Sequence, residues 1–235
     1  MFIYEKTNPE VILIHLHGFA SDVKGNKVRL LVERSRKGVF SFFTMDMDYQ
    51  TTTTTKTLEV LDTLVKGFSQ KFKEIWLSGS SHGGYVLLNY LRFYAAEKVR
   101  KVFLFSPSYS TLSLTIQEVG MDKCEKWLKG EEELHFVECE TGLEFTIHKD
   151  FAVDIIQKGY EIIKDSKVNF PKDLSYPLYI FHGTFDNVVP IDHSRLFVKE
   201  IKVQRYVEVE DDHRLSNTFK DLVENFNPKL NIPLC

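Results

Sequence analysis

The sequence is poor in cysteine. Its 235 residues include only three, Cys124, Cys139 and Cys235, an odd number without regular spacing. This pattern excludes a disulfide framework and a zinc site built from spaced cysteines. We expect all three thiols to be reduced and incidental to the fold.

The sequence also lacks a large excess of charge and any long apolar run. The formal net charge is −3, and no basic stripe indicates a nucleic acid partner. No window approaches the roughly 18 apolar residues that a membrane-spanning helix needs. The first ten residues resemble neither a signal peptide nor a transit peptide, so we expect a cytoplasmic protein without a membrane span.

What the sequence does contain is a regular alternation of strand and helix patterns. Short apolar runs predict strands, and the amphipathic stretches between them predict helices. Repeated units of this kind predict an α/β fold with a mostly parallel, doubly wound sheet in a single domain, residues 1–235. The predicted strands are 11–18, 39–47, 73–80, 99–108, 177–183 and 203–210, and the predicted helices are 26–38, 56–68, 82–97, one beginning near Pro190, and 215–226.

Two segments depart from this alternation. Residues 109–172 contain an alternating stretch around "CETG", which predicts a β-hairpin, and then a stretch with helical periodicity. This segment is too short and too polar for an independent domain, so we expect a cap inserted into the sheet domain. The run Thr51–Thr55 predicts a loop whose last threonines cap the following helix.

The stretch "GSSHG" matches the pattern G-x-S-x-G, with Ser81 at its centre, between a predicted strand and a predicted helix. In that context the serine occupies a strained turn that exposes its hydroxyl. Gly79 and Gly83 are expected there because a Cβ at either position would clash, and Gly84 is expected to allow close packing of the helix. Ser81 is therefore a candidate nucleophile, although a glycine-rich turn without catalytic meaning is the alternative.

A serine nucleophile needs a base, and the base needs a carboxylate that orients it. His213 follows the last predicted strand and Asp186 follows strand 177–183, which gives the order Ser…Asp…His. Asp211 and Asp212 are too close to His213 in sequence for their side chains to converge on it. We expect them to be loop caps or solvated charges.

The other histidines are expected to be structural. His182 lies inside a predicted strand, where we expect it to be packed or hydrogen-bonded. A metal site at His15 and His17 is disfavoured because no carboxylate lies near them in sequence.

Acyl transfer also needs donors for an oxyanion. The backbone N–H of His82 is one candidate, and the backbone N–H of Phe19, after the first predicted strand, is the other. Gly18 permits the close turn there. In the insertion, four aromatic residues are candidates to line an apolar substrate pocket or, equally, to pack the cap onto the body: Trp127, Phe136, Phe145 and Phe151.

With "HGFASDVKGNK", "GSSHGG", "HGTFDNVVP" and "DHRL" in this order, the sequence resembles the α/β-hydrolase family over essentially its whole length. Within that family it is most similar to small serine esterases and thioesterases related to the mitochondrial acyl-glucuronide esterase and depalmitoylating thioesterase. It departs from that group at His82, where an apolar residue is usual, and at Thr51–Thr55, where a Gly/Ser loop is usual.

The resemblance implies hydrolysis of a small-molecule carboxylic ester or thioester through an acyl-enzyme on Ser81, with no cofactor and no metal. Other reactions on the same three residues stay open, namely those of a serine exopeptidase, an acyltransferase or a C–C bond hydrolase. A non-catalytic ligand-binding protein on the same scaffold also stays open. The sequence does not fix the acyl length, the leaving group or the oligomeric state.

Overall fold

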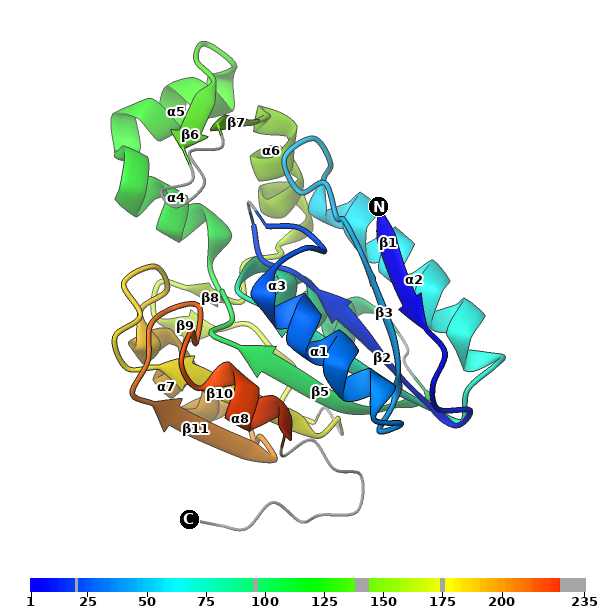
Figure 1. The fold of residues 1–235 in the computed structure, drawn as a ribbon. Coiled ribbons are helices and arrows are strands. Elements are labelled where there is room, and N and C mark those ends of the chain that lie inside the picture. The colour runs from blue at the N-terminus through cyan, green and yellow to red at the C-terminus, as the bar shows by residue number, and fades with distance from the viewer. Residues whose placement is uncertain (20, 95–96, 138–143, 174–175, 225–235) are drawn as a thin grey trace.

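A twisted, mostly parallel sheet forms the centre of the molecule (Figure 1). The structure is a computed structural model that describes residues 1–19, 21–94, 97–137, 144–173 and 176–224. Within these ranges the sheet has seven strands, and every neighbouring pair is parallel except the pair at one edge, β1 with β3. In spatial order the strands are β1 (Phe2–Glu5), β3 (Ser41–Met45), β2 (Val11–Leu16), β4 (Glu74–Ser80), β5 (Val99–Phe105), β10 (Leu178–Gly183) and β11 (Arg205–Val209).

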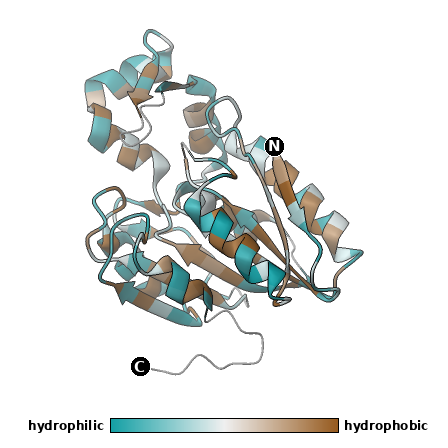
Figure 2. Cartoon of the chain, in the orientation of Figure 1, coloured by the Kyte–Doolittle hydropathy of each residue, from teal (hydrophilic) through white to brown (hydrophobic). Residues whose placement is uncertain are grey.

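Helices cover both faces of this sheet, as the alternation predicts. The apolar side chains of α1 (Asn26–Arg36) and α8 (Phe219–Glu224) belong to one buried cluster. Those of α2 (Thr54–Ser69), α3 (His82–Phe93) and α7 (Ile191–Glu200) belong to the other. Figure 2 shows the hydrophobic residues concentrated on the strands between these helices.

Consecutive residues of β2 show why this strand is a continuous apolar run. Leu13 packs with the α1 side of the sheet, whereas Ile12 and Ile14 pack with the α2 and α3 side. All six residues of β2 are buried, because side chains alternate between two covered faces.

The segment between β5 and β10 projects beyond one end of the sheet (Figure 1). The predicted hairpin is confirmed by the antiparallel pairing of β6 with β7; the "CETG" stretch between them lies outside the described residues. The helix predicted after the hairpin is present, but it ends at Gly159, which has a left-handed conformation. In chain order the segment comprises α4 (Thr111–Val119), α5 (Met121–Lys129), β6 (Leu134–Val137), β7 (Glu144–Ile147), α6 (Lys149–Lys158), β8 (Ile163–Lys164) and β9 (Lys167–Val168).

The predicted elements of the sheet domain are present with shifted ends. The last helix begins at Phe219 rather than at 215, because Leu215 has a positive φ of 54°. The carboxylate of Asp211 also binds the backbone amides of Asn217 and Thr218, which holds residues 215–218 in a turn.

Two further expectations concern the thiols and the helices. Cys124 is buried and is not in a disulfide, whereas Cys139 and Cys235 lie outside the described residues. No helix in the described ranges combines the length and the apolar character needed to span a membrane.

Candidate active site

Ser81 occupies the turn between β4 and α3 in a conformation that side chains rarely adopt. Its φ is 51° and its ψ is −118°, outside the regions favoured by L-residues. The turn is held by hydrogen bonds from Ser81 N to Phe105 O, at 3.0 Å, and from Ser108 N to Ser81 O, at 3.1 Å. The side chain is partly exposed, so its hydroxyl is accessible.

The glycines around this turn allow three backbone segments to meet. A Cβ at Gly83 would lie 2.3 Å from Leu16 O, and one at Gly79 would lie 2.6 Å from the Gly83 carbonyl. A Cβ at Gly84 would lie 2.8 Å from the Cβ of Pro107, so this glycine allows α3 to pack closely, as predicted. No residue with a Cβ fits at positions 79 and 83 without movement of the backbone.

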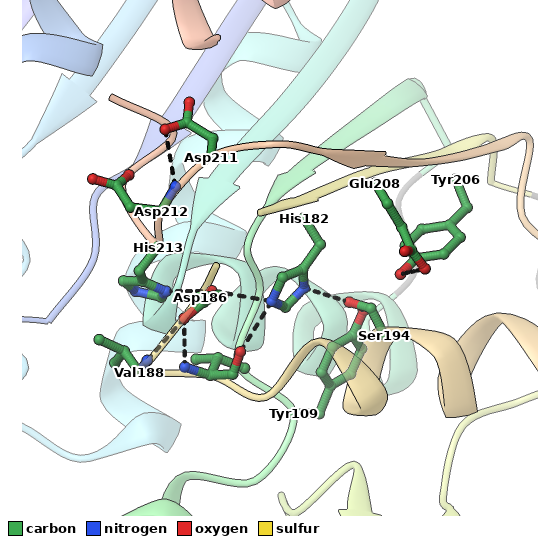
Figure 3. Close-up of polar contacts among 11 residues, drawn as sticks. Tyr109, His182, Asp186, Val188, Ser194, Tyr206, Glu208, Asp211, Asp212 and His213 are labelled. Atoms are coloured by element: carbon green, nitrogen blue, oxygen red, sulfur yellow. Dashed lines mark hydrogen bonds and ion pairs between the residues drawn. The ribbon is translucent and has the colours of Figure 1, made fainter. Parts of the chain in front are cut away.

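Asp186 and His213 form a hydrogen-bonded pair on the loops that follow β10 and β11 (Figure 3). His213 Nδ1 lies 2.7 Å from Asp186 Oδ2, while Asp186 Oδ1 accepts hydrogen bonds from Val188 N and Val189 N. The Asp186 side chain is completely buried, and that of His213 is 16% exposed. Because the carboxylate accepts these donors, Nδ1 of His213 carries the proton in the neutral ring, which leaves Nε2 as a base.

The pKa of Asp186 reflects two opposed effects. Burial raises the pKa, but hydrogen bonds from His182, from His213 and from the amide of Val189, together with the charge on His213, lower it further than burial raises it. The net shift is well below the ordinary value, so Asp186 is a carboxylate at neutral pH.

The structure brings Asp186 to His213, but it does not join His213 to Ser81 by a hydrogen bond. Within the described part of the chain, the Ser81 hydroxyl makes no hydrogen bond. The three residues nevertheless all follow parallel strands, β4, β10 and β11, at the carboxyl edge of one sheet.

Asp211 and Asp212, the two aspartates before His213, cap a loop, which is one of the two roles expected for them. Asp211 is buried, not solvated, and binds the backbone amides and side chains of Asn217 and Thr218. Asp212 accepts hydrogen bonds from the amide and hydroxyl of Ser216.

The loop after β2 lies directly beside Ser81. A Cβ at Gly18 would be 4.0 Å from Ser81 Oγ, and the ring of Phe19 meets that of His82 edge-on at 5.2 Å. His17 fixes this loop, because its Nδ1 lies 2.8 Å from Gly18 O and its Nε2 accepts a hydrogen bond from Met47 N at 2.9 Å. Sequence reasoning did not give His17 this role, although its position beside Gly18 is a signal that could have done so.

His82 is enclosed by aromatic rings and points into the protein. Its side chain contacts Phe19, Tyr49, Tyr85 and Phe151 at centroid distances of 4.6–5.6 Å. Burial lowers the pKa of His82 from 6.5 to about 3, so the ring is neutral at neutral pH. It therefore packs as an aromatic residue where an apolar one was expected from the resemblance.

The four aromatic candidates of the insertion have different environments. Trp127 is buried and donates a hydrogen bond to Ile147 O, so it belongs to the interior of the insertion itself. Phe145 and Phe151 contact Phe19, at centroid distances of 5.7 and 5.9 Å, and Phe136 stacks on Phe145. The aromatic row that reaches the Ser81 region thus runs through Phe145 and Phe151.

No group of three or more His, Cys, Asp or Glu side chains that could hold a metal ion is found in the part of the chain that the structure describes. Figure 3 shows that the side chains around Asp186 are instead hydrogen-bonded to one another and to backbone.

Comparison with known proteins identifies the fold. No protein-family model matches the sequence, and no curated protein matches it significantly. Three solved structures are similar over most of both chains. They are "Putative hydrolase" from Agrobacterium vitis S4 (19% identity, 95% of this chain and 89% of that chain, TM-score 0.76), Est1E from Butyrivibrio proteoclasticus with bound ferulic acid (18%, 96% and 91%, 0.74), and the mouse alpha/beta hydrolase domain-containing protein 10 (18%, 94% and 89%, 0.71). The chain therefore has the α/β-hydrolase fold.

Proposed function

We propose that this protein is a serine hydrolase that cleaves carboxylic esters or thioesters. The observation that carries the proposal is the strained, partly exposed Ser81 at the same sheet edge as the hydrogen-bonded pair Asp186–His213. Proteins named as an esterase domain and as a monoacylglycerol lipase are among the structures of this fold, with TM-scores of 0.61 and 0.67. Since fold alone does not give the reaction, the proposal depends on the site residues.

In the proposed reaction, Ser81 Oγ attacks the acyl carbonyl carbon while His213 Nε2 accepts its proton. Asp186 stabilises the imidazolium that forms, and the amides of Phe19 and His82 donate hydrogen bonds to the oxyanion. His213 then protonates the leaving group and activates water to hydrolyse the acyl-enzyme. Hydrogen bonds between nucleophile and base are often long without substrate and shorten when it binds, which is the movement required here between Ser81 and His213.

We assign the insertion, residues 109–172, the role of a cap over the acyl-binding side of this site. Phe145 and Phe151 come from the insertion and contact Phe19 beside Ser81. Their apolar rings favour an acyl group with substantial apolar surface over acetate, because each CH₂ group removed from water contributes about 0.8 kcal/mol.

The test is hydrolysis of p-nitrophenyl esters and matching thioesters with acyl chains of two to sixteen carbons. We expect Ser81→Ala to reduce kcat by at least about 10³-fold, with little change in thermal unfolding. Ser80→Ala is the matched control, because Ser80 is the preceding serine and its hydroxyl is buried without a hydrogen-bond partner in the described residues. Full activity in Ser81→Ala, or covalent labelling of that variant by a fluorophosphonate probe, would contradict the proposal.

A further inference from the structure

His182 and His213 lie on opposite sides of Asp186, and both contact its carboxylate (Figure 3). His182 is completely buried near the end of β10. Its Nε2 lies 3.0 Å from Asp186 Oδ2 and 3.1 Å from Val189 O. Both of these atoms are acceptors, so Nε2 of His182 carries a proton.

The other ring nitrogen of His182, Nδ1, is at one end of a row of hydrogen-bonded, buried hydroxyl groups. Nδ1 lies 2.7 Å from Ser194 Oγ of α7, and Ser194 Oγ lies 2.9 Å from the hydroxyl of Tyr109. All three residues are fully buried. With the proton on Nε2 of a neutral ring, the Ser194 hydroxyl donates to Nδ1 and accepts from Tyr109, so each group in the row has a partner.

Asp186 thus has both of its oxygen atoms engaged. Oδ1 accepts from the backbone amides of Val188 and Val189, and Oδ2 faces one nitrogen of His213 and one of His182. A carboxylate has about four lone-pair sites, and these four donors use all of them, which favours the observed orientation of Asp186. This arrangement also spreads the negative charge of Oδ2 over two donors.

We propose that His182 is a positioning residue of the reaction, which holds Asp186 Oδ2 toward His213 and moderates the basicity of His213 by sharing that oxygen. The inference deepens the proposed hydrolase function and rests on it. A donor on a carboxylate weakens the attraction of the carboxylate for a neighbouring imidazolium. Loss of His182 should therefore leave a stronger, but less well oriented, partner for His213.

Other titratable or charged groups lie near this row, and a substitution at His182 leaves their residues unchanged. Lys27 of α1 lies close enough to Asp186 to interact with its charge, and His193 of α7 and Glu208 of β11 lie near His182. Glu208 is paired with Arg195, at 2.7 Å. Since neutral substitutions of His182 change none of these charges, a shift in the titration of His213 reports the lost contact itself.

The experiment compares His182→Leu, which removes the donor, with His182→Gln, whose side-chain amide can replace the Nε2–H. We expect His182→Leu to lower kcat/KM by about 10–100-fold and to move the acidic limb of its pH profile up by roughly half a unit or more. His182→Gln should restore most of the rate and the original limb. The control is His15→Leu, because His15 is an equally buried histidine that bonds to Ser78 on the neighbouring strand; it should reduce stability without moving the limb.

The pKa of His213 is also measured by NMR titration in a Ser81→Ala background, which needs no substrate. A raised pKa of His213 in His182→Leu supports the inference even if no ester is hydrolysed, in which case only the proposed function fails. An unchanged His213 pKa, or an equal change in His15→Leu, overturns it. If His182→Leu does not fold, Ser194→Ala replaces it, because this change releases Nδ1 of His182; a smaller shift in the same direction supports the inference, and no shift overturns it.

Discussion

At the scale of single residues, Gly83 has the least room of the glycines around Ser81. A Cβ there would lie 2.3 Å from Leu16 O and 2.6 Å from His17 O, and neither backbone atom can rotate away. We expect Gly83→Ala to destabilise the protein by about 1–3 kcal/mol, and to slow fluorophosphonate labelling because β2 must shift away from Ser81.

Urea unfolding measures the change in the free energy of unfolding, with Gly67→Ala as the control. Position 67 is in α2 with nothing near an added Cβ, so that variant should gain about 0.5–1 kcal/mol. A Gly83→Ala variant as stable as the parent would contradict the prediction.

The candidate site residues that the sequence could suggest are those with a local sequence signal. For Ser81 the signal is the glycines around it, and for Asp186 and His213 it is their positions after predicted strands. The environment of His182 could not be predicted in the same way. Its contact with Ser194 depends on how α7 packs against β10, and its contact with Asp186 depends on the loop between them folding back. The sequence therefore predicted that His182 is packed or hydrogen-bonded, but not which residues it contacts.

At the scale of secondary structure elements, the threonine run joins the sheet domain to the insertion. Thr53 caps α2 by accepting a hydrogen bond from Lys56 N. The amide and hydroxyl of Thr55 donate to the carboxylate of Asp154 in α6, at 2.9 and 2.6 Å. The sequence predicted a threonine cap, but the helix begins earlier than expected: Thr53 is the cap, and Thr54 and Thr55 already belong to α2 rather than to the loop. The contact with Asp154 spans 99 residues, and no local pattern encodes it.

This link gives a prediction for the insertion. We expect Asp154→Ala to cost about 1–2 kcal/mol, because the Thr55 amide and hydroxyl lose a charged acceptor, and to increase amide hydrogen exchange in α6. Gln157→Ala is the control, since Gln157 is exposed on the same helix. Equal exchange in both variants would show that Thr55 does not hold α6.

Elements were predicted well where an apolar pattern repeats and poorly where it is short. The strands buried on both faces, such as β2 and β4, were identified with ends within about two residues. The edge strand β1 has four residues, too few to show a period. Helix α4 has no fully buried residue, so its sequence carries little of the amphipathic pattern that identifies a helix.

At the scale of the whole molecule, we expect the protein to lose stability in acid because it buries neutral histidines. Burial lowers the pKa values of His15 and His82 from 6.5 to about 3. Between these values the unfolded chain binds protons that the folded protein does not, so stability falls as the pH falls from about 6.5 toward 3. Each of the two rings contributes up to about 1.4 kcal/mol per pH unit within that window.

Glu161 changes the pH dependence of stability in the opposite direction to the histidines. It must therefore be taken into account when the effect of the histidines is measured. Burial raises the pKa of Glu161 from 4.5 to about 7. Its contribution is therefore complete below pH 4.5 and is lost as the pH rises through 7. Between pH 4.5 and 6.5 this one carboxyl offsets about one such histidine. Burial also lowers the pKa values of His17 and His193, so the stability should still fall as the pH falls through this range.

Urea unfolding from pH 7 to 5 measures this slope, and the variant that isolates one ring is His15→Gln, which keeps a polar group beside Ser78. It should flatten the dependence by about 1 kcal/mol per pH unit, because glutamine does not titrate. His135→Gln is the matched control, since the side chain of His135 is 67% exposed. If His15→Gln keeps the full slope, His15 is protonated in the folded protein, and the sheet must then hold a charge beside Ser78 that its apolar surroundings cannot solvate.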